Sequence, residues 1–348
     1  MFSLILTFIL GLQSLHESGF RGQGMTIAII DCGFYGADSA AYFPQEQIIG
    51  WYDLVEDSLR THAMTEWSQD AHGTMCLSTI LYESPAFTGT APDARFILIR
   101  TEELESEHRR EVDRLARGIL LADSLGADII SISLGYNRMD IDSTAFSLTD
   151  LDGSSTASRA ATQAARHNRI VCIAAGNDGS RPDWGRITIP GDADSVLTVG
   201  SCTADSLHAA TSGSGPTADG RIKPEVSAWG QNTYVFDPTI ADIRTGSGTS
   251  FATPEIAGMV ACLWQALPHL TAMQLRQAII RSAHQYDLPD NQLGYGIPNA
   301  WLVYQRENQT TAATSVELPK QREKVLYNGH LYILIDGRWY TLTGVPLN

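Results

Sequence analysis

The sequence predicts an α/β protein: a doubly wound, mainly parallel sheet flanked by helices, with a small β-hairpin at the C-terminus. Several short runs are almost continuously apolar and rich in β-branched residues, as strands buried on both faces are. Segments with helical periodicity separate these runs, and alternating strands and helices are typical of a parallel sheet covered on both sides. The strongest runs are Thr26–Asp31, Arg95–Arg100, Asp128–Leu134, Arg169–Ala175 and Ser195–Gly200.

The intervening helices are indicated by spacing and composition. Within Glu111–Gly126 the apolar residues recur at helical intervals, and Gly126 is suited to end the helix. Ala157–His167 is an alanine-rich helix, and an apolar helix extends from Ser250 to about Leu267. Sheets of this kind carry their functional sites at the carboxyl ends of the strands.

The chain divides into four expected parts. Residues 1–14 form an apolar N-terminal segment, 15–304 the main domain, 305–323 a linker and 324–348 a hairpin tail. Met1–Leu10 resembles a signal-peptide core but lacks a basic start and a clear cleavage site. A helix that belongs to the fold, or a protein whose true start lies upstream, would explain this segment equally well.

The C-terminal expectations depend on turn residues and polarity. Gln305–Arg322 is polar without periodicity, which predicts a linker. Turns at Tyr327–Gly329 and Asp336–Gly337 separate alternating segments, which predicts a hairpin or small meander. This tail resembles short hairpins on exported bacterial proteins, where it would serve in sorting or surface retention. The alternative is a strand pair that docks on the main domain.

Composition excludes several classes of protein. The chain has 348 residues, 43% hydrophobic, and its net charge is 24 − 39 = −15. This acidic balance argues against nucleic-acid partners and against anionic membranes. No apolar run reaches the roughly 18 residues that a membrane-spanning helix needs. Five cysteines without CxxC spacing argue against disulfides or a zinc site and for small buried side chains. We expect a monomer.

Four segments place a reactive side chain in a suitable local setting. Asp31 ends the first strand, His72 begins a run of small residues, and Ser250 begins an apolar helix. A serine nucleophile needs a base, the base needs an orienting carboxylate, and a helix N-terminus favours a developing oxyanion. Asn177 follows another strand, and its amide is suited to donate to that oxyanion. These residues fit acyl-transfer chemistry if the fold brings them together.

These segments resemble the subtilisin-like serine peptidases, or subtilases. The most specific motif is Gly248–Pro254 (GTSFATP), followed by His72–Thr74 (HGT), whereas Asp31-x-Gly33 is weak alone. The order Asp, His, Ser also matches the family and differs from other serine hydrolases. The resemblance covers about Leu15 to Trp301.

The resemblance implies a serine endopeptidase that forms an acyl-enzyme on Ser250, with Asp31 and His72 completing the triad. It further implies that Asn177 is the oxyanion donor and that Ser133, Leu134 and Gly135 form the edge that pairs with an extended substrate. The implied partners are protein or peptide substrates in an exported location, and no cofactor or metal is required.

The chain also departs from the family pattern. Cys32 stands where serine or threonine is usual, and the short stretch from His72 to Gly89 lacks the insertion that holds a calcium ion in secreted members. Calcium is therefore not supported, and we expect Asp150–Gly153 to form a turn. No propeptide precedes the domain, so we expect either folding without one or a start that lies upstream.

The sequence leaves two other functions to consider. A peptide-binding pseudoenzyme is disfavoured because all four catalytic positions are filled. A general acyl hydrolase would use the same site, since the chain has no GxSxG elbow. The acidic run Thr101–Glu107 is either a solvated helix start or a feature that favours basic substrate residues.

Overall fold

A seven-stranded parallel sheet forms the centre of the protein. The computed structural model describes residues 10–55, 71–103, 107–140, 145–314, 323–327, 330–335 and 338–340. The spatial order is β2-β3-β1-β4-β5-β6-β7, which confirms the predicted doubly wound fold. The strands are β1 (Thr26–Asp31), β2 (Ile48–Asp53), β3 (Arg95–Arg100), β4 (Ile129–Ile132), β5 (Ile170–Ala174), β6 (Leu197–Cys202) and β7 (Val226–Trp229).

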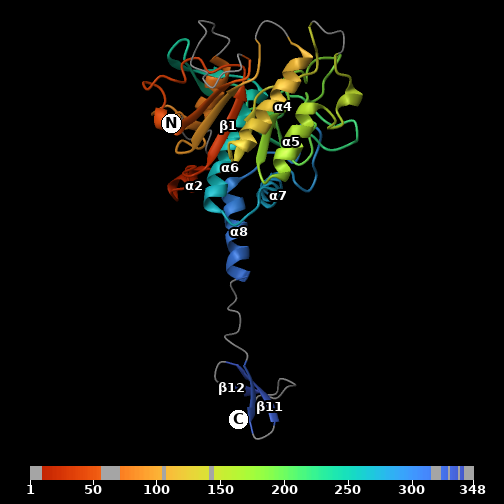
Figure 1. Cartoon of the computed structure of the whole chain (residues 1–348). Helices are drawn as coiled ribbons and strands as arrows, with labels where there is room; N and C mark the ends of the chain where they lie inside the picture. Colours follow the sequence, from red (N-terminus) through yellow and green to blue (C-terminus); the bar gives the residue numbers. More distant parts are fainter. Residues whose placement is uncertain are drawn as a thin grey trace. The chain divides into compact units, whose positions relative to one another are not determined.

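Helices cover both faces of this sheet (Figure 1). The helices α4 (Arg109–Ser124) and α5 (Thr156–Arg166) lie side by side on one face, where they enclose one apolar core. The other face is covered by α3 (His72–Leu81), α6 (Thr249–Ala266) and α7 (Ala272–Ser282), around a second and larger core. Both faces of β1 are therefore buried, which is why its sequence is almost uniformly apolar.

The strands differ in how well the sequence predicts them. β1 and β3 have the predicted bounds, while β6 starts two residues later than expected, after Ser195 with its positive φ of 63°. β2 was not predicted, because most of its residues are only half-buried or exposed and the apolar pattern is interrupted. β7 and the antiparallel pair β8 (Thr233–Asp237) and β9 (Asp242–Gly246) were not predicted either.

The expected boundary after residue 14 is wrong for the residues that the structure describes. Leu10, Leu12 and Leu15 are all fully buried in the larger core, and the short helix α2 spans Gln13–Glu17. The carbonyl of Leu10 accepts a hydrogen bond of 2.8 Å from the backbone nitrogen of Ala300. The main unit thus includes the chain from Leu10 onward, and residues 1–9 lie outside the described part.

The first part of the predicted linker is helical. The helix α8 spans Ala300–Thr314, which is a correction to an irregular segment over 305–323. Gln305–Thr314 has no proline or glycine, so the helix that begins at Ala300 meets no residue that would end it. Within the remaining C-terminal residues, β10 (Glu323–Tyr327), β11 (His330–Ile335) and β12 (Arg338–Tyr340) form a three-stranded antiparallel sheet. The chain forms two compact units, 1–304 and 305–348.

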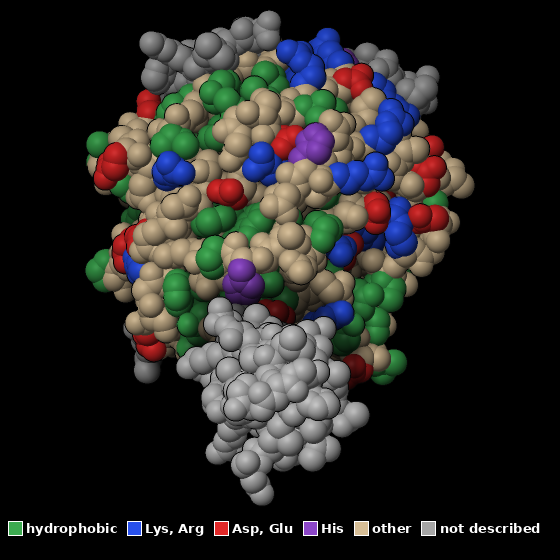
Figure 2. Space-filling model, turned by 60° about the horizontal axis from the view of Figure 1, so that its bottom comes forward, with side chains coloured by type: hydrophobic (Ala, Val, Ile, Leu, Met, Phe, Trp, Pro, Cys, Tyr) green, Lys and Arg blue, Asp and Glu red, His purple; other side chains and the backbone are tan. Residues whose placement is uncertain are grey.

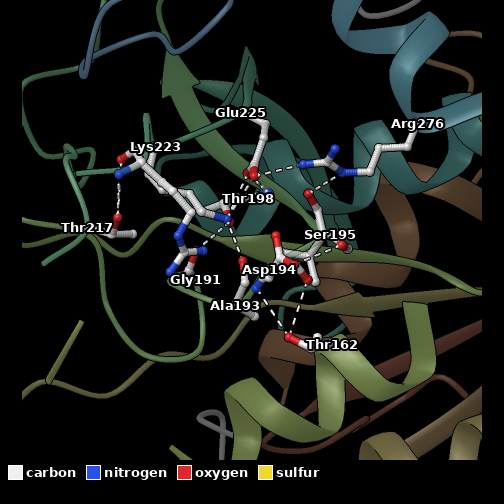
Figure 3. A network of polar contacts seen from close by, with 12 residues as sticks. Thr162, Gly191, Ala193, Asp194, Ser195, Thr198, Thr217, Lys223, Glu225 and Arg276 are labelled. Atoms are coloured by element: carbon white, nitrogen blue, oxygen red, sulfur yellow. Dashed lines mark hydrogen bonds and ion pairs between the residues drawn. The ribbon is translucent and has the colours of Figure 1, made fainter. Parts of the chain in front are cut away.

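A fully buried lysine lies three residues before β7 (Figure 3). Lys223 Nζ donates to the carbonyl of Ala193 at 2.8 Å and to Thr198 Oγ1 at 2.9 Å. It also lies 2.9 Å from Glu225, which accepts a further bond of 3.0 Å from Arg276. Burial lowers the pKa of Lys223, while the charge and hydrogen bond of Glu225 oppose this. The ammonium group thereby joins the loop after β5 to β6 and β7.

The surface shows mixed side-chain chemistry. On the face in Figure 2 acidic, basic and apolar side chains are interspersed, with Lys and Arg gathered toward the upper right. Large apolar side chains that are exposed in the described residues come from different elements, namely Ile49, Leu120, Leu125, Leu148, Leu207, Ile240 and Leu288. All five cysteines are buried and free, which confirms the prediction for them.

Candidate active site

Asp31 and His72 form an ion pair at the carboxyl end of β1. Asp31 is the last residue of that strand and is fully buried, while His72 is the first residue of α3 and exposes 28% of its side chain. The distance from His72 Nδ1 to Asp31 Oδ1 is 2.7 Å, and the backbone nitrogen of Cys32 donates to the same oxygen at 2.8 Å. Burial lowers the pKa of His72, but the adjacent charge and hydrogen bond of Asp31 raise it well above 6.5.

Gly73 allows α3 to approach the end of β1 this closely. A Cβ atom at this position would lie 2.4 Å from the carbonyl oxygen of Gly33 and 2.8 Å from Cβ of Asp31. The Gly73 nitrogen donates to that Gly33 carbonyl at 3.1 Å, and Thr74 Oγ1 donates to the carbonyl of Tyr35 at 2.8 Å. Through these two hydrogen bonds, the HGT motif holds α3, which begins at His72, against the loop that follows Asp31.

Ser250 lies in the first turn of α6 and is 7% exposed. The preceding Gly248 has a φ of 153°, a backbone conformation that favours glycine. Pro254 is four residues after Ser250 and has no N–H, so the helix cannot bond the Ser250 carbonyl in the usual way. That carbonyl instead accepts bonds from Ser133 Oγ at 2.8 Å and Cys76 Sγ at 3.3 Å. Pro254 thus leaves the Ser250 carbonyl available to side chains from two other segments.

The Asp31–His72 pair and the backbone of Ser250 come together at Cys76. Cys76 Sγ, which binds the Ser250 carbonyl, also lies 3.8 Å from His72 Nδ1, and the His72 ring packs against Phe251 with centroids 5.9 Å apart. Ser250 Oγ donates to the carbonyl of Ser133 at 3.3 Å, and among the described residues no hydrogen bond joins it to His72. Catalytic hydrogen bonds often form only when substrate is bound, so this arrangement is compatible with a resting site.

The Asn177 amide is oriented by Thr249, the residue before Ser250. Its Oδ1 accepts bonds from the Thr249 nitrogen at 2.9 Å and from Thr249 Oγ1 at 3.2 Å. Since the backbone nitrogen can only donate, these bonds fix which amide atom faces Thr249. Asn177 Nδ2 is then left exposed near the start of α6, with no hydrogen-bond partner among the described residues.

Ser133–Gly135 follow the carboxyl end of β4 and form an open backbone edge. Ser133 is held by its two bonds to Ser250, whereas Tyr136 pairs with Ile189. Within the described part of the chain, the backbone groups of Leu134 and Gly135 make no hydrogen bond. This edge is therefore free to pair with an extended peptide.

A pocket of about 320 Å³ lies between this edge and the segment 174–177. Thr249 and Ser250 line it, and so do Glu102, Glu107 and Asp178. Thr188 also lines the pocket and was missed by the sequence analysis, because nothing in its surroundings in the chain marks it. Cys76 was missed too, although its position four residues after His72 places it on the same face of α3.

The expected turn at Asp150–Gly153 uses its carboxylates locally. Asp150 accepts bonds from the nitrogen and hydroxyl of Ser147, both at 2.7 Å, and Asp152 accepts one of 2.9 Å from the Ser154 nitrogen. These bonds satisfy the carboxylates within the turn.

Known proteins resemble this chain in sequence and in fold. The sequence model described as "Subtilase family" matches residues 22–296. The chain is 28% identical to serine protease AprX of Bacillus subtilis over 80% of its own length and 66% of AprX. It is 27% identical to subtilisin DY of Bacillus licheniformis, over 78% of this chain and 88% of that one.

A solved structure, MycP1 with its N-terminal propeptide removed, superposes with a TM-score of 0.65 at 26% identity. The match covers 86% of this chain and 96% of MycP1. The chain spans about two thirds of the length of AprX. Among the described residues, no helix is long and apolar enough to cross a membrane.

Proposed function

Because this chain belongs to the subtilase family of serine endopeptidases, we propose that Asp31, His72 and Ser250 form its catalytic triad. The single observation that carries this assignment is that the Asp31–His72 pair, from β1 and α3, and the backbone carbonyl of Ser250, from α6, come together around Cys76. These residues are separated by up to 219 positions in the chain (250 − 31), so their convergence is a property of the fold.

In the proposed reaction, the Ser250 hydroxyl leaves the Ser133 carbonyl and turns toward His72. His72 takes the hydroxyl proton as Ser250 Oγ attacks the scissile carbonyl, and it then gives that proton to the departing amine. Water hydrolyses the acyl-enzyme by the same proton transfers in reverse. Asp31 holds the imidazole in position and stabilises the imidazolium. The raised pKa of His72 implies that the neutral base is reached on the alkaline side of 6.5.

The oxyanion would be stabilised by Asn177 Nδ2 and the backbone nitrogen of Ser250. Support for this comes from the bonds between Asn177 Oδ1 and Thr249, which leave the amide nitrogen exposed beside the nucleophile. The position of Ser250 in the first turn of α6 adds the favourable end of the helix dipole.

The substrate would be a protein or peptide segment paired with Leu134 and Gly135. This chemistry uses only groups of the chain itself, without metal or cofactor. We further propose that the enzyme is a monomer and acts after export, as the apolar start of the chain suggests.

A fluorophosphonate probe on the full chain, followed by mass spectrometry, tests the triad. We expect a label on Ser250 that is lost in Ser250→Ala and in His72→Ala, and a fall in peptide hydrolysis of at least about 10⁴-fold in both variants. Ser247→Ala is the matched control, since this serine is three residues away and bonds only to Asn232. A folded protein that binds peptides but is neither labelled nor active would instead be a peptide-binding protein.

A further inference from the structure

The pocket beside Ser250 has a chemistry that the family assignment does not supply, and the following argument rests on the proposed function. Ser250, Thr249 and Asn177 line the pocket together with Gly135 and Gly176. A side chain that enters it therefore belongs to the substrate residue whose carbonyl is attacked. The pocket's contents decide which residue that is.

Three carboxylic acids line this pocket, and none of its lining residues is Lys or Arg. Asp178 accepts a hydrogen bond from Asn137 and lies 3.3 Å from Arg181. Glu102 is buried and accepts a hydrogen bond from the Tyr136 hydroxyl, while Glu107 is exposed at the pocket.

Neighbouring Glu111 differs from these acids because its oxygens are already used. They accept bonds from the backbone nitrogens of Glu103 at 2.8 Å and His108 at 2.6 Å. Both Glu111 oxygens thus bind backbone groups, whereas Glu102 and Glu107 line the pocket. Burial raises the pKa of Glu102 to about 8 and, together with Glu111 and Asp140, that of Glu107 to about 7. A positive charge in the pocket would relieve this crowding of acids.

A second feature of the pocket points independently to a polar ligand. Thr188 is 3% exposed, and among the residues that the structure describes its Oγ1 has no hydrogen-bond partner. This hydroxyl lies between the two backbone edges, since a Cβ atom at Gly135 or Gly176 would lie 2.1 or 2.6 Å from it. A buried hydroxyl without a partner is costly, and a donor brought in by the substrate would satisfy it.

We propose that this pocket receives an arginine or lysine side chain of the substrate, with Glu102 and Glu107 as the specificity-determining carboxylates and Thr188 as an acceptor. The cation's several N–H donors match both the carboxylates and the hydroxyl. Cleavage then occurs after basic residues.

Fluorogenic peptides that differ only in the residue before the scissile bond test this proposal. The series is Arg, Lys, Gln and Leu, assayed at pH 9 with EDTA so that the carboxyls are ionised and free of divalent cations. We expect kcat/KM for Arg and Lys to exceed that for Gln and Leu by about tenfold or more. Faster cleavage after Leu or Gln would overturn the proposal and leave the proposed triad intact.

Variants assign the preference to named side chains. Glu102→Gln and Glu107→Gln should each lower the ratio of Arg to Gln cleavage by about tenfold. Glu83→Gln, which removes the same charge from an exposed pair with Arg21, should leave that ratio unchanged. Thr188→Val, which removes the hydroxyl, should lower the ratio of Arg to Gln cleavage. Thr188→Ser, which keeps the hydroxyl, should have the wild-type ratio. Unchanged ratios in the Glu102 and Glu107 variants would refute their role.

Binding separates this proposal from catalysis. In the full-length Ser250→Ala protein, fluorescence anisotropy with labelled peptides should show tighter binding of the Arg peptide than of the Gln peptide. Equal affinities would contradict the proposal even if no peptide were cleaved by the wild-type enzyme. If the wild-type protein showed neither hydrolysis nor fluorophosphonate labelling, while the Ser250→Ala protein still bound the Arg peptide selectively, the proposed function would be contradicted instead.

Discussion

Replacing Lys223 by methionine should destabilise the protein strongly, although Lys223 lies outside the proposed active site. Its ammonium group donates to the Ala193 carbonyl and Thr198 Oγ1 and pairs with Glu225. Methionine has a similar length but no donor, so the two neutral acceptors lose their partner inside the protein. Each such loss costs about 1–3 kcal/mol.

The total loss in the free energy of unfolding depends on which bonds of the network in Figure 3 remain. Glu225 still bonds to Arg276 at 3.0 Å and to the Thr198 nitrogen at 2.8 Å, so its charge is not left alone. We therefore expect about 3 kcal/mol, at the low end of the cost of breaking a buried ion pair. For a unit of this size, that loss corresponds to a fall in Tm of roughly 5 °C.

Thermal unfolding followed by circular dichroism measures this difference. The Ser250→Ala background prevents self-digestion during heating. The matched control is Arg221→Met. Arg221 is two residues before Lys223 and pairs with Asp219 at the surface, so its replacement should lower the free energy of unfolding by no more than about 1 kcal/mol. If Lys223→Met were no more destabilising than this control, the reasoning about the buried network would be refuted.

Two further predictions concern the site helices. Gly73→Ala puts a methyl group 2.4 Å from the Gly33 carbonyl oxygen, which should cost about 1–3 kcal/mol and displace His72 enough to lower kcat by about tenfold or more; wild-type kcat and Tm would contradict this. Burial raises the pKa of Glu255 well above 4.5, so the folded state holds a proton that the unfolded state releases, and this group's contribution to stability falls as pH rises above 4.5. Glu255→Gln should therefore raise Tm by roughly 3 °C at about pH 8 but not at about pH 4, and an equal effect at both pH values would show that ionisation is not the cause.

The sheet could be predicted from sequence, and the candidate triad residues could be selected there, because their signals are local. Buried parallel strands such as β1 and β3 are continuous apolar runs, and Asp31 is marked by the end of one of them. Ser250 is marked by the helix that follows it. The partly exposed β2 gives no such run, so a prediction based on apolar continuity misses it.

The pocket could not be predicted in the same way, because the residues that line it come from segments far apart in the chain. Thr188 lies on a loop after β5, and its packing against Gly135 and Gly176 places it in the same pocket as Ser250. The acidic run had suggested a preference for basic residues as one alternative. The structure adds which acids face the pocket: Glu102 and Glu107 do, while Glu111 binds the backbone.

The carbonyl of Ser250, which Pro254 leaves without a helical partner, ties enzymatic competence to the folding reaction itself. Its two donors come from positions 117 and 174 residues away in the chain, and Asp31 and His72 come from the N-terminal part of the unit. Contacts of such long range form late, after most loop-closure entropy has been lost. A nascent chain that lacks the α6 segment would then contain no assembled site. The cell would face an active peptidase only at the last step of folding, when the chain is itself most resistant to cleavage.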